Sequence, residues 1–261
     1  MQSAASASSF PRFFEDVRVV APAAERALRV EWLPDGRTML VFRVLDEGRS
    51  GTLSVAGPRT RAMFKNAPGV VRSVVLPFKP GWSAPLLGVA ANALTDRIVS
   101  LQDIWGIAGG DLCRELLAAP RLPDVLDRLA RAFAVRTHQT FEPASASLAR
   151  RAVRLLEGDE VRVESVAERL GVTSRHLRRA FTESIGIGPK EFARTVRLQR
   201  AVRTAAATGS DWVRIAADAG YYDQAHLIAD FRELVGFTPA DFLKRAGDRG
   251  TGYGSKDCAA A

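Results

Sequence analysis

Arginine side chains cluster between Ser174 and Arg179, where three of the six residues carry a guanidinium group. A guanidinium can donate two parallel hydrogen bonds to the O6 and N7 atoms of guanine, and it can also hold phosphate oxygens. A run of arginines is often no more than the solvated face of a helix. Its chemistry therefore depends on the element that carries it.

The arginine cluster lies within a pattern that the chain contains twice. The first copy consists of Ala167, Gly171, Leu177, Phe181, Gly186 and Pro189, and the second of Ala216, Gly220, Leu227, Phe231, Gly236 and Pro239. The small Ala lets two helices approach each other, and the first Gly ends one helix in the left-handed conformation. Leu and Phe place an apolar stripe on the next helix. Because these features recur together, they favour two helix-turn-helix units over a plain helical hairpin repeat.

The residues at the start of each second helix indicate different roles for the two units. Thr173 or Ser174 can cap this helix in the first unit, and Asp223 can cap it in the second. An Arg-rich helix start fits the major groove, whereas the second unit offers only the Gln224 amide to read adenine. Asp230 would also repel phosphate if it faced the DNA backbone. We therefore expect the first unit to read bases and the second to contribute mostly shape and backbone contacts.

The segment between the two copies is predicted to form one long helix. Pro189 occupies its first turn, and Gly209 follows its end near Ala207. A helix of roughly 27 Å, at about 1.5 Å per residue, can hold two reading helices about one DNA turn apart. It also carries three arginines at intervals of three residues, Arg194, Arg197 and Arg200. We expect some of these arginines to pair with acidic neighbours and stabilise the packing.

The stretch from Val163 to Leu243 resembles the DNA-binding domain of AraC/XylS-type transcription regulators. The resemblance rests on both copies of the pattern and on the segments 174–179, 197–201, 215–216, 220–224 and 236–239. It implies sequence-specific binding of double-stranded DNA. The candidate DNA contacts are Ser174, Arg175, Arg178, Arg179, Gln224, Ala225 and His226. Ala229 stands where the family usually has Arg, which agrees with weaker base reading by the second unit.

Residues 12–137 are predicted to form a separate α+β domain, with a curled antiparallel sheet and helices. Strand-like segments cover residues 37–45, 51–55 and 70–78, and a hairpin signal at residues 46–48 joins the first two. Helical periodicity covers residues 84–93, 107–118 and 122–136. We interpret residues 138–147 as a linker, residues 148–246 as the all-α DNA-binding domain and residues 247–261 as a disordered tail.

The front half also resembles the N-terminal domain found on a subset of these regulators. The similar segments are residues 33–36, 78–81, 86–89, 94–97 and 101–106. This resemblance does not point to a particular ligand. We interpret Trp32, Trp82 and Trp105 as core or rim packing, and a sensor pocket lined by them is the alternative.

Composition agrees with a regulator that has a polyanionic partner. The chain has 261 residues, 47% of them hydrophobic, and a net charge of +8. Its two cysteines, Cys113 and Cys258, exclude a disulfide framework and a Cys-based zinc site. The longest apolar stretch, residues 84–94, is too short to cross a membrane, and residues 1–6 lack the features of a signal peptide. We therefore expect a cytoplasmic protein.

Enzyme functions fit the sequence poorly. His138, His176 and His226 have no carboxylates or cysteines at metal-ligand spacing, and Gly109–Asp111 is followed by no phosphate-loop Lys. We predict a non-catalytic transcription regulator without metal or cofactor, whose N-terminal domain binds a small-molecule effector or a second copy of the chain. The alternatives are a DNA-alkylation repair regulator, which the missing Cys cluster disfavours, and an architectural DNA binder without a sensor.

Overall fold

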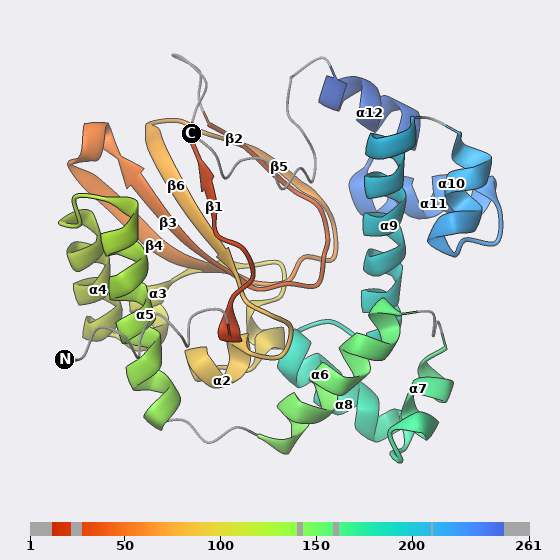
Figure 1. The fold of residues 1–261 in the computed structure, drawn as a ribbon, viewed down its shortest axis with the longest axis horizontal. Coiled ribbons are helices and arrows are strands. Elements are labelled where there is room, and N and C mark those ends of the chain that lie inside the picture. The colour runs from red at the N-terminus through yellow and green to blue at the C-terminus, as the bar shows by residue number, and fades with distance from the viewer. Residues whose placement is uncertain (1–11, 22–27, 140–142, 159–161, 210, 248–261) are drawn as a thin grey trace.

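A computed structural model describes residues 12–21, 28–139, 143–158, 162–209 and 211–247. We call residues 12–139 the N-terminal domain and residues 143–247 the helical domain. In Figure 1 a curved sheet with helices packed beside it forms the first, and helices arranged around one long helix form the second. This confirms the predicted fold class.

The N-terminal domain contains a five-stranded antiparallel sheet and a two-stranded ribbon. The sheet order is β1 (Arg18–Val20), β6 (Val70–Pro77), β3 (Met39–Leu45), β4 (Ser50–Ala56) and β7 (Ile98–Ser100). The ribbon pairs β2 (Leu28–Trp32) with β5 (Met63–Ala67). The three strands that the sequence predicted are confirmed, and η1 (Asp46–Gly48) joins β3 to β4 at the predicted hairpin. Of the other four strands, β1 and β7 have only three residues each and β5 lacks a clear alternation of polarity. The remaining strand, β2, does alternate (Leu-Arg-Val-Glu-Trp) and was overlooked.

Alternate residues of the central strand β3 face two different apolar layers. Leu40 and Phe42 belong to the main core, which also includes side chains of α4 (Ile107–Leu117) and α5 (Leu122–Gln139). Met39 and Val41 belong to a smaller layer on the opposite face, with Trp32 of the ribbon beside it. The period of two in a strand produces this division. The ribbon therefore covers the face of the sheet that the helices leave open.

One predicted helix is wrong and one predicted linker is shorter than expected. Residues 84–93 form two short helices, α2 (Ser83–Leu87) and η2 (Ala91–Leu94), because Gly88 takes φ +76° and ends the first. A further helix, α3 (Leu101–Trp105), precedes α4. Residues 138 and 139 lie in α5, and residues 144–147 lie in α6 (Ala144–Glu157). Ala146 is buried there, so at least one residue of a segment that resembles a loop in composition serves in helix packing.

The helical domain contains both predicted helix-turn-helix units. The first consists of α7 (Val163–Arg169) and α8 (Ser174–Ile185), and the second of α10 (Trp212–Ala219) and α11 (Gln224–Val235). The 20-residue helix α9 (Pro189–Thr208) joins them, as predicted, and α12 (Pro239–Gly247) follows. The expected disordered tail lies outside the described residues, apart from Gly247 in α12. In the described part of the chain, no helix has the length and apolarity that a membrane span requires.

The N-terminal domain packs against both helix-turn-helix units. At the first unit, Thr95 Oγ1 donates a hydrogen bond of 2.7 Å to the Gly186 carbonyl. At the second unit, the Ala62 N–H donates one of 2.7 Å to the Leu234 carbonyl. Between them, the loop at residues 33–37 reaches α9, where Gln199 Nε2 donates to the Pro34 carbonyl at 3.0 Å. The relative position of the two units is thus braced by the N-terminal domain.

Asp35 in this loop makes folding stability depend on pH. Burial raises the pKa of its carboxyl to about 6 from an ordinary 3.8, although Arg37 acts in the opposite direction. The folded state therefore binds this proton more tightly than the unfolded state, so stability falls as the pH rises from about 4 to about 6. Asp35→Asn removes the buried charge and keeps an oxygen that can accept from the Arg37 N–H.

We expect Asp35→Asn to raise the free energy of unfolding at pH 7.5 by about 1–2 kcal/mol, since one pKa unit corresponds to about 1.4 kcal/mol and the side chain keeps some contact with solvent. Urea titrations of the full chain between pH 4 and pH 7.5 measure this gain. The partly exposed, ion-paired Asp127 provides the control variant Asp127→Asn. Equal effects of the two variants at pH 7.5 would contradict the prediction.

Candidate nucleic-acid interface

The turn of the first unit is built by the residues that the sequence singled out. Gly171 takes φ +69° after α7, and the Val172 N–H donates to the Ala167 carbonyl at 3.0 Å. Thr173 caps α8 by accepting from the His176 N–H at 3.2 Å, which decides between the two predicted caps. Leu177 and Phe181 are fully buried. These contacts fix which side of α8 faces solvent.

Three of the four candidate DNA contacts on α8 are exposed. Arg175, Arg178 and Arg179 lie on its solvent side, and Ser174 is half-buried at the first turn. Arg178 Nη2 lies 3.6 Å from Glu164 Oε1 of α7, and both side chains are largely exposed. An exposed pair of this kind contributes little, about 0–1 kcal/mol, so phosphate or guanine can displace Glu164. The helix therefore presents three guanidinium groups at one surface.

The second unit has the same frame with one extra residue in its turn. Gly220 takes φ +83°, and the Tyr221 N–H donates to the Ala216 carbonyl at 2.9 Å, as Val172 does in the first unit. The extra residue is Tyr222, whose relative exposure is 94%. Asp223 then caps α11 by accepting from the His226 N–H at 2.7 Å, as predicted. The turn thus displays an aromatic side chain that the first unit lacks.

The candidate contacts on α11 are exposed but chemically weaker. Gln224, Ala225 and His226 all lie at the surface. The His226 ring packs edge-on against Tyr221 with ring centroids 5.2 Å apart, and its Nδ1 accepts from the Tyr222 N–H at 3.5 Å. One ring nitrogen is therefore engaged within the turn. Of the three predicted contacts on α11, Gln224 alone has a side-chain amide. This amide has no hydrogen-bond partner among the described residues, so it can read a base.

Asp230 does not face the DNA side of α11. Its side chain is buried, and Arg194 of α9 donates to its Oδ1 through Nη2 at 2.7 Å and Nε at 3.1 Å. Arg194 Nη2 also reaches Glu233 Oε2 at 2.7 Å. Asp230 therefore does not repel phosphate at the exposed surface of α11. The equivalent position in α8 is Ala180, which is also buried.

Arg197 confirms the predicted pairing with an acidic neighbour, whereas Arg200 binds backbone carbonyls instead. Arg197 lies over the Tyr221 ring at 5.5 Å, and its Nη2 is 4.0 Å from Asp230 Oδ2. Arg200 donates to the carbonyls of Glu157 and Gly158 at the end of α6. With Arg194, these side chains join α9 to its neighbours instead of extending the α8 surface.

Two exposed residues of the second unit were not predicted from the sequence. Tyr222 precedes the cap of α11, and Arg232 lies on the solvent side of that helix, at the position equivalent to Thr182 in the first unit. The exposure of Tyr222 could have been predicted from the extra residue in the second turn, because an inserted turn residue has no counterpart that packs in the first unit. Arg232 could have been found by aligning the two copies beyond the helix start.

The tryptophans are packing residues, as interpreted. Trp82 and Trp105 lie against the main core, and Trp105 Nε1 donates to the Leu87 carbonyl at 3.2 Å. The Arg150 and Arg136 guanidinium groups stack over their rings at 4.3 Å and 4.4 Å. A hollow of about 240 Å³ does lie between the sheet and the ribbon, but none of the three tryptophans lines it. The alternative of a tryptophan-lined sensor pocket is thus wrong for this hollow.

Comparisons with known proteins agree with the two-part organisation. Residues 166–245 match a family described as a helix-turn-helix domain, and residues 15–100 match one described as a domain of unknown function. No curated protein matches the chain. Similar solved structures include three of ToxT from Vibrio cholerae. One of them, from strain O395 and with no ligand named, has a TM-score of 0.45 and 10% identity over 88% of this chain and 97% of that one.

The other two ToxT structures have ligands bound. One, with an unsaturated fatty acid, has a TM-score of 0.43 and 13% identity over 88% of this chain and 95% of that one. Another, with (E)-4-(8-methylnaphthalen-1-yl)but-3-enoic acid, has a TM-score of 0.46 and 11% identity over 89% and 98%. The family matches and the paired units lead to one assignment: the chain joins a C-terminal helix-turn-helix domain of the AraC type to an N-terminal domain of unknown function.

Proposed function

We propose that this chain is a sequence-specific DNA-binding transcription regulator that reads bases mainly through α8. The observation that carries the proposal is the difference between two helices with the same frame. The exposed Arg175 and Arg179 of α8 correspond to Ala225 and Ala229 of α11. Helices α8 and α11 can each enter a major groove of DNA, and α9 joins the two units that carry them. The three guanidinium groups on α8 supply contacts to bases and phosphates.

We propose further that the N-terminal domain controls DNA binding through a small-molecule effector, or through pairing with a second copy of the chain. Its contacts with both units support this role, because a shift of the N-terminal domain would change how the units are held. An architectural binder would need no such bracing. The repair alternative finds no support at Cys113, since burial raises the pKa of its thiol and lowers the fraction of reactive thiolate.

Arginine substitutions on α8 test the proposal. Arg175→Ala or Arg178→Ala should weaken specific DNA binding by about 1–3 kcal/mol and relax the preference at one or two base pairs, because a guanidinium pairs bidentately with guanine. Gel-shift titrations at fixed salt measure the loss. Arg131→Ala removes the same charge from an exposed site on α5 and serves as the control. If both α8 variants bind like wild type, the proposal is wrong.

The two halves of the bound site should differ in information content. Because α11 offers Gln224 but no exposed Arg at its start, its half should tolerate mismatches better than the half read by α8. Selection of bound sequences from a random DNA pool measures the information at each position. Two halves of equal content, one helical turn apart, would show that the second unit reads bases as strongly as the first.

A further inference from the structure

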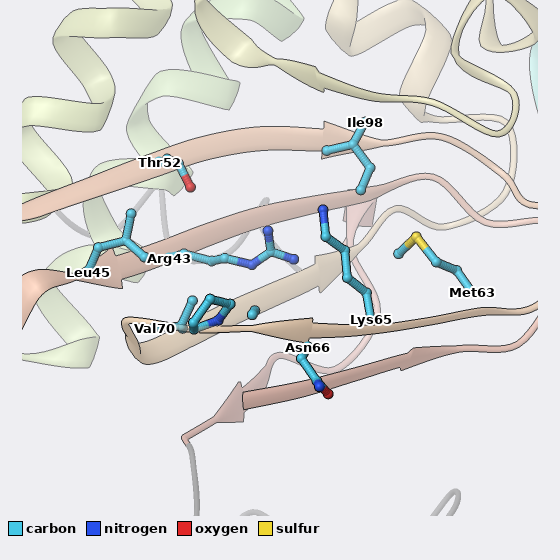
Figure 2. A pocket seen from close by; sticks show the side chains of 10 residues that line it. Arg43, Leu45, Thr52, Met63, Lys65, Asn66, Val70 and Ile98 are labelled. Carbon is cyan, nitrogen blue, oxygen red and sulfur yellow. The ribbon is translucent and has the colours of Figure 1, made fainter. Parts of the chain in front are cut away.

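The hollow between the sheet and the ribbon places two cations close together. Arg43 extends into it from β3 and Lys65 from β5, and Figure 2 shows both charged ends turned into the same space. Around them lie apolar side chains, among them Leu45, Met63 and Ile98. The volume of about 240 Å³ is below the roughly 300–1,000 Å³ of sites for drug-sized ligands. The hollow therefore suits a small molecule.

Neither cation has an anionic partner in the part of the chain that the structure describes. Among the described residues, no carboxylate lines the hollow and no ion pair involves Arg43 or Lys65. The Arg43 Nε atom is buried and has no hydrogen-bond partner. Burial lowers the pKa of its guanidinium, which reflects the free energy spent on holding that charge away from water. Buried donors are nearly always paired in folded proteins, so an unpaired one inside a hollow points to a missing acceptor.

We propose that this hollow binds a small organic carboxylate, with its charged group between Arg43 and Lys65 and its apolar part against Met63 and Ile98. A carboxylate matches the fork of a guanidinium and can accept two of its hydrogen bonds at once. The ammonium group of Lys65 neutralises the remaining charge. The apolar walls select a compact hydrocarbon portion over a second charged group, because no further cation lines the hollow.

The ribbon connects this site to the second helix-turn-helix unit, and this step rests on the proposed function. Successive residues of a strand point to opposite sides. Met63 and Lys65 line the hollow, whereas Ala62 and Phe64 lie on the side of the helical domain. The Ala62 N–H bonds to the Leu234 carbonyl, and the Phe64 ring lies 5.5 Å from that of Phe237. A ligand held by Lys65 and Met63 therefore contacts one side of β5, and the other side of this strand packs against the helical domain.

Titration of the full chain with straight-chain carboxylates from acetate to octanoate tests the site, with hexan-1-ol and hexylamine as neutral and cationic controls. We expect hexanoate to bind and raise the melting temperature, and the controls not to. Arg43→Gln and Lys65→Gln should each weaken hexanoate binding roughly tenfold or more, because each removes a charge-assisted contact. Arg131→Gln, an exposed site of the same domain, should leave it unchanged.

The ligand-free variant provides a second readout. Arg43→Gln should melt no lower than wild type without ligand, because the Arg43 side chain makes no hydrogen bond or ion pair with the described residues that the variant would lose, and Gln keeps part of its aliphatic stem. A clear drop in its melting temperature would mean that Arg43 serves the fold and would overturn the inference. Failure of every carboxylate to bind at millimolar concentration would overturn it as well. Neither result touches the proposed DNA reading, which the α8 arginine variants test separately.

Discussion

Replacing Arg194 by Ala is expected to be among the most damaging single changes in the helical domain, with a loss of about 2–3 kcal/mol. Arg194 donates to the carboxylates of Asp230 and Glu233, and the Asp230 side chain is only 9% exposed. Breaking a buried ion pair costs about 3–5 kcal/mol because the remaining charge is left without a partner. The partial exposure of Arg194, 24%, and the nearby Arg197 reduce this figure.

The repeat itself provides the matched control for this prediction. The first unit carries Ala180 where the second carries Asp230, so a unit of this kind folds without the acid. Asp230→Ala in the Arg194→Ala background should therefore recover most of the lost stability. Urea unfolding of the wild type, both single variants and the double variant gives the coupling free energy. A double variant no more stable than Arg194→Ala would show that packing of the Arg194 stem, rather than the stranded carboxylate, causes the loss.

The helix-turn-helix frame could be predicted because its signals are local. Gly171 and Gly220 adopt the left-handed conformation that only glycine takes readily, and Thr173 and Asp223 cap the helices that follow them. Each of these residues acts on backbone a few positions away. The exposed arginines followed directly, since the buried Leu177 and Phe181 determine which side of α8 faces solvent. The pairing of Asp230 with Arg194 could not be predicted from local signals, because the two residues are 36 positions apart in the sequence.

The N-terminal domain was harder to predict because its small elements depend on distant contacts. The sequence of β5, Met63–Ala67, contains Lys and Asn and shows no apolar alternation, yet it forms a strand because β2 pairs with it. One side of this strand lines the hollow with both Met63 and Lys65, and the other side meets the helical domain, so neither side shows a simple pattern. Residues 144–147 joined α6 for a related reason. Of these four residues only Ala146 is buried, and its small side chain suits a close approach between packed elements.

A matched pair of glycines can measure the contact between the N-terminal domain and the first unit. Gly186 and Gly236 hold equivalent positions at the ends of α8 and α11, with φ of +97° and +85°. Alanine at either position strains the backbone by roughly 1–2 kcal/mol. A Cβ on Gly236 would meet nothing within 4 Å, whereas one on Gly186 would lie 2.4 Å from Pro58 Cγ and 2.9 Å from the Ala91 carbonyl oxygen. Only Gly186→Ala therefore pushes against the N-terminal domain.

We expect Gly186→Ala to destabilise the full chain by about 2–4 kcal/mol and Gly236→Ala by about 1 kcal/mol, since overpacking adds roughly 1–3 kcal/mol to the shared backbone strain. Urea unfolding of both variants measures the difference. In a fragment of residues 143–247, which lacks Pro58 and Ala91, the two variants should differ little. A large difference that persists in the fragment would place its cause within α8. Equal effects in the full chain would mean that the N-terminal domain does not hold the first unit at this point.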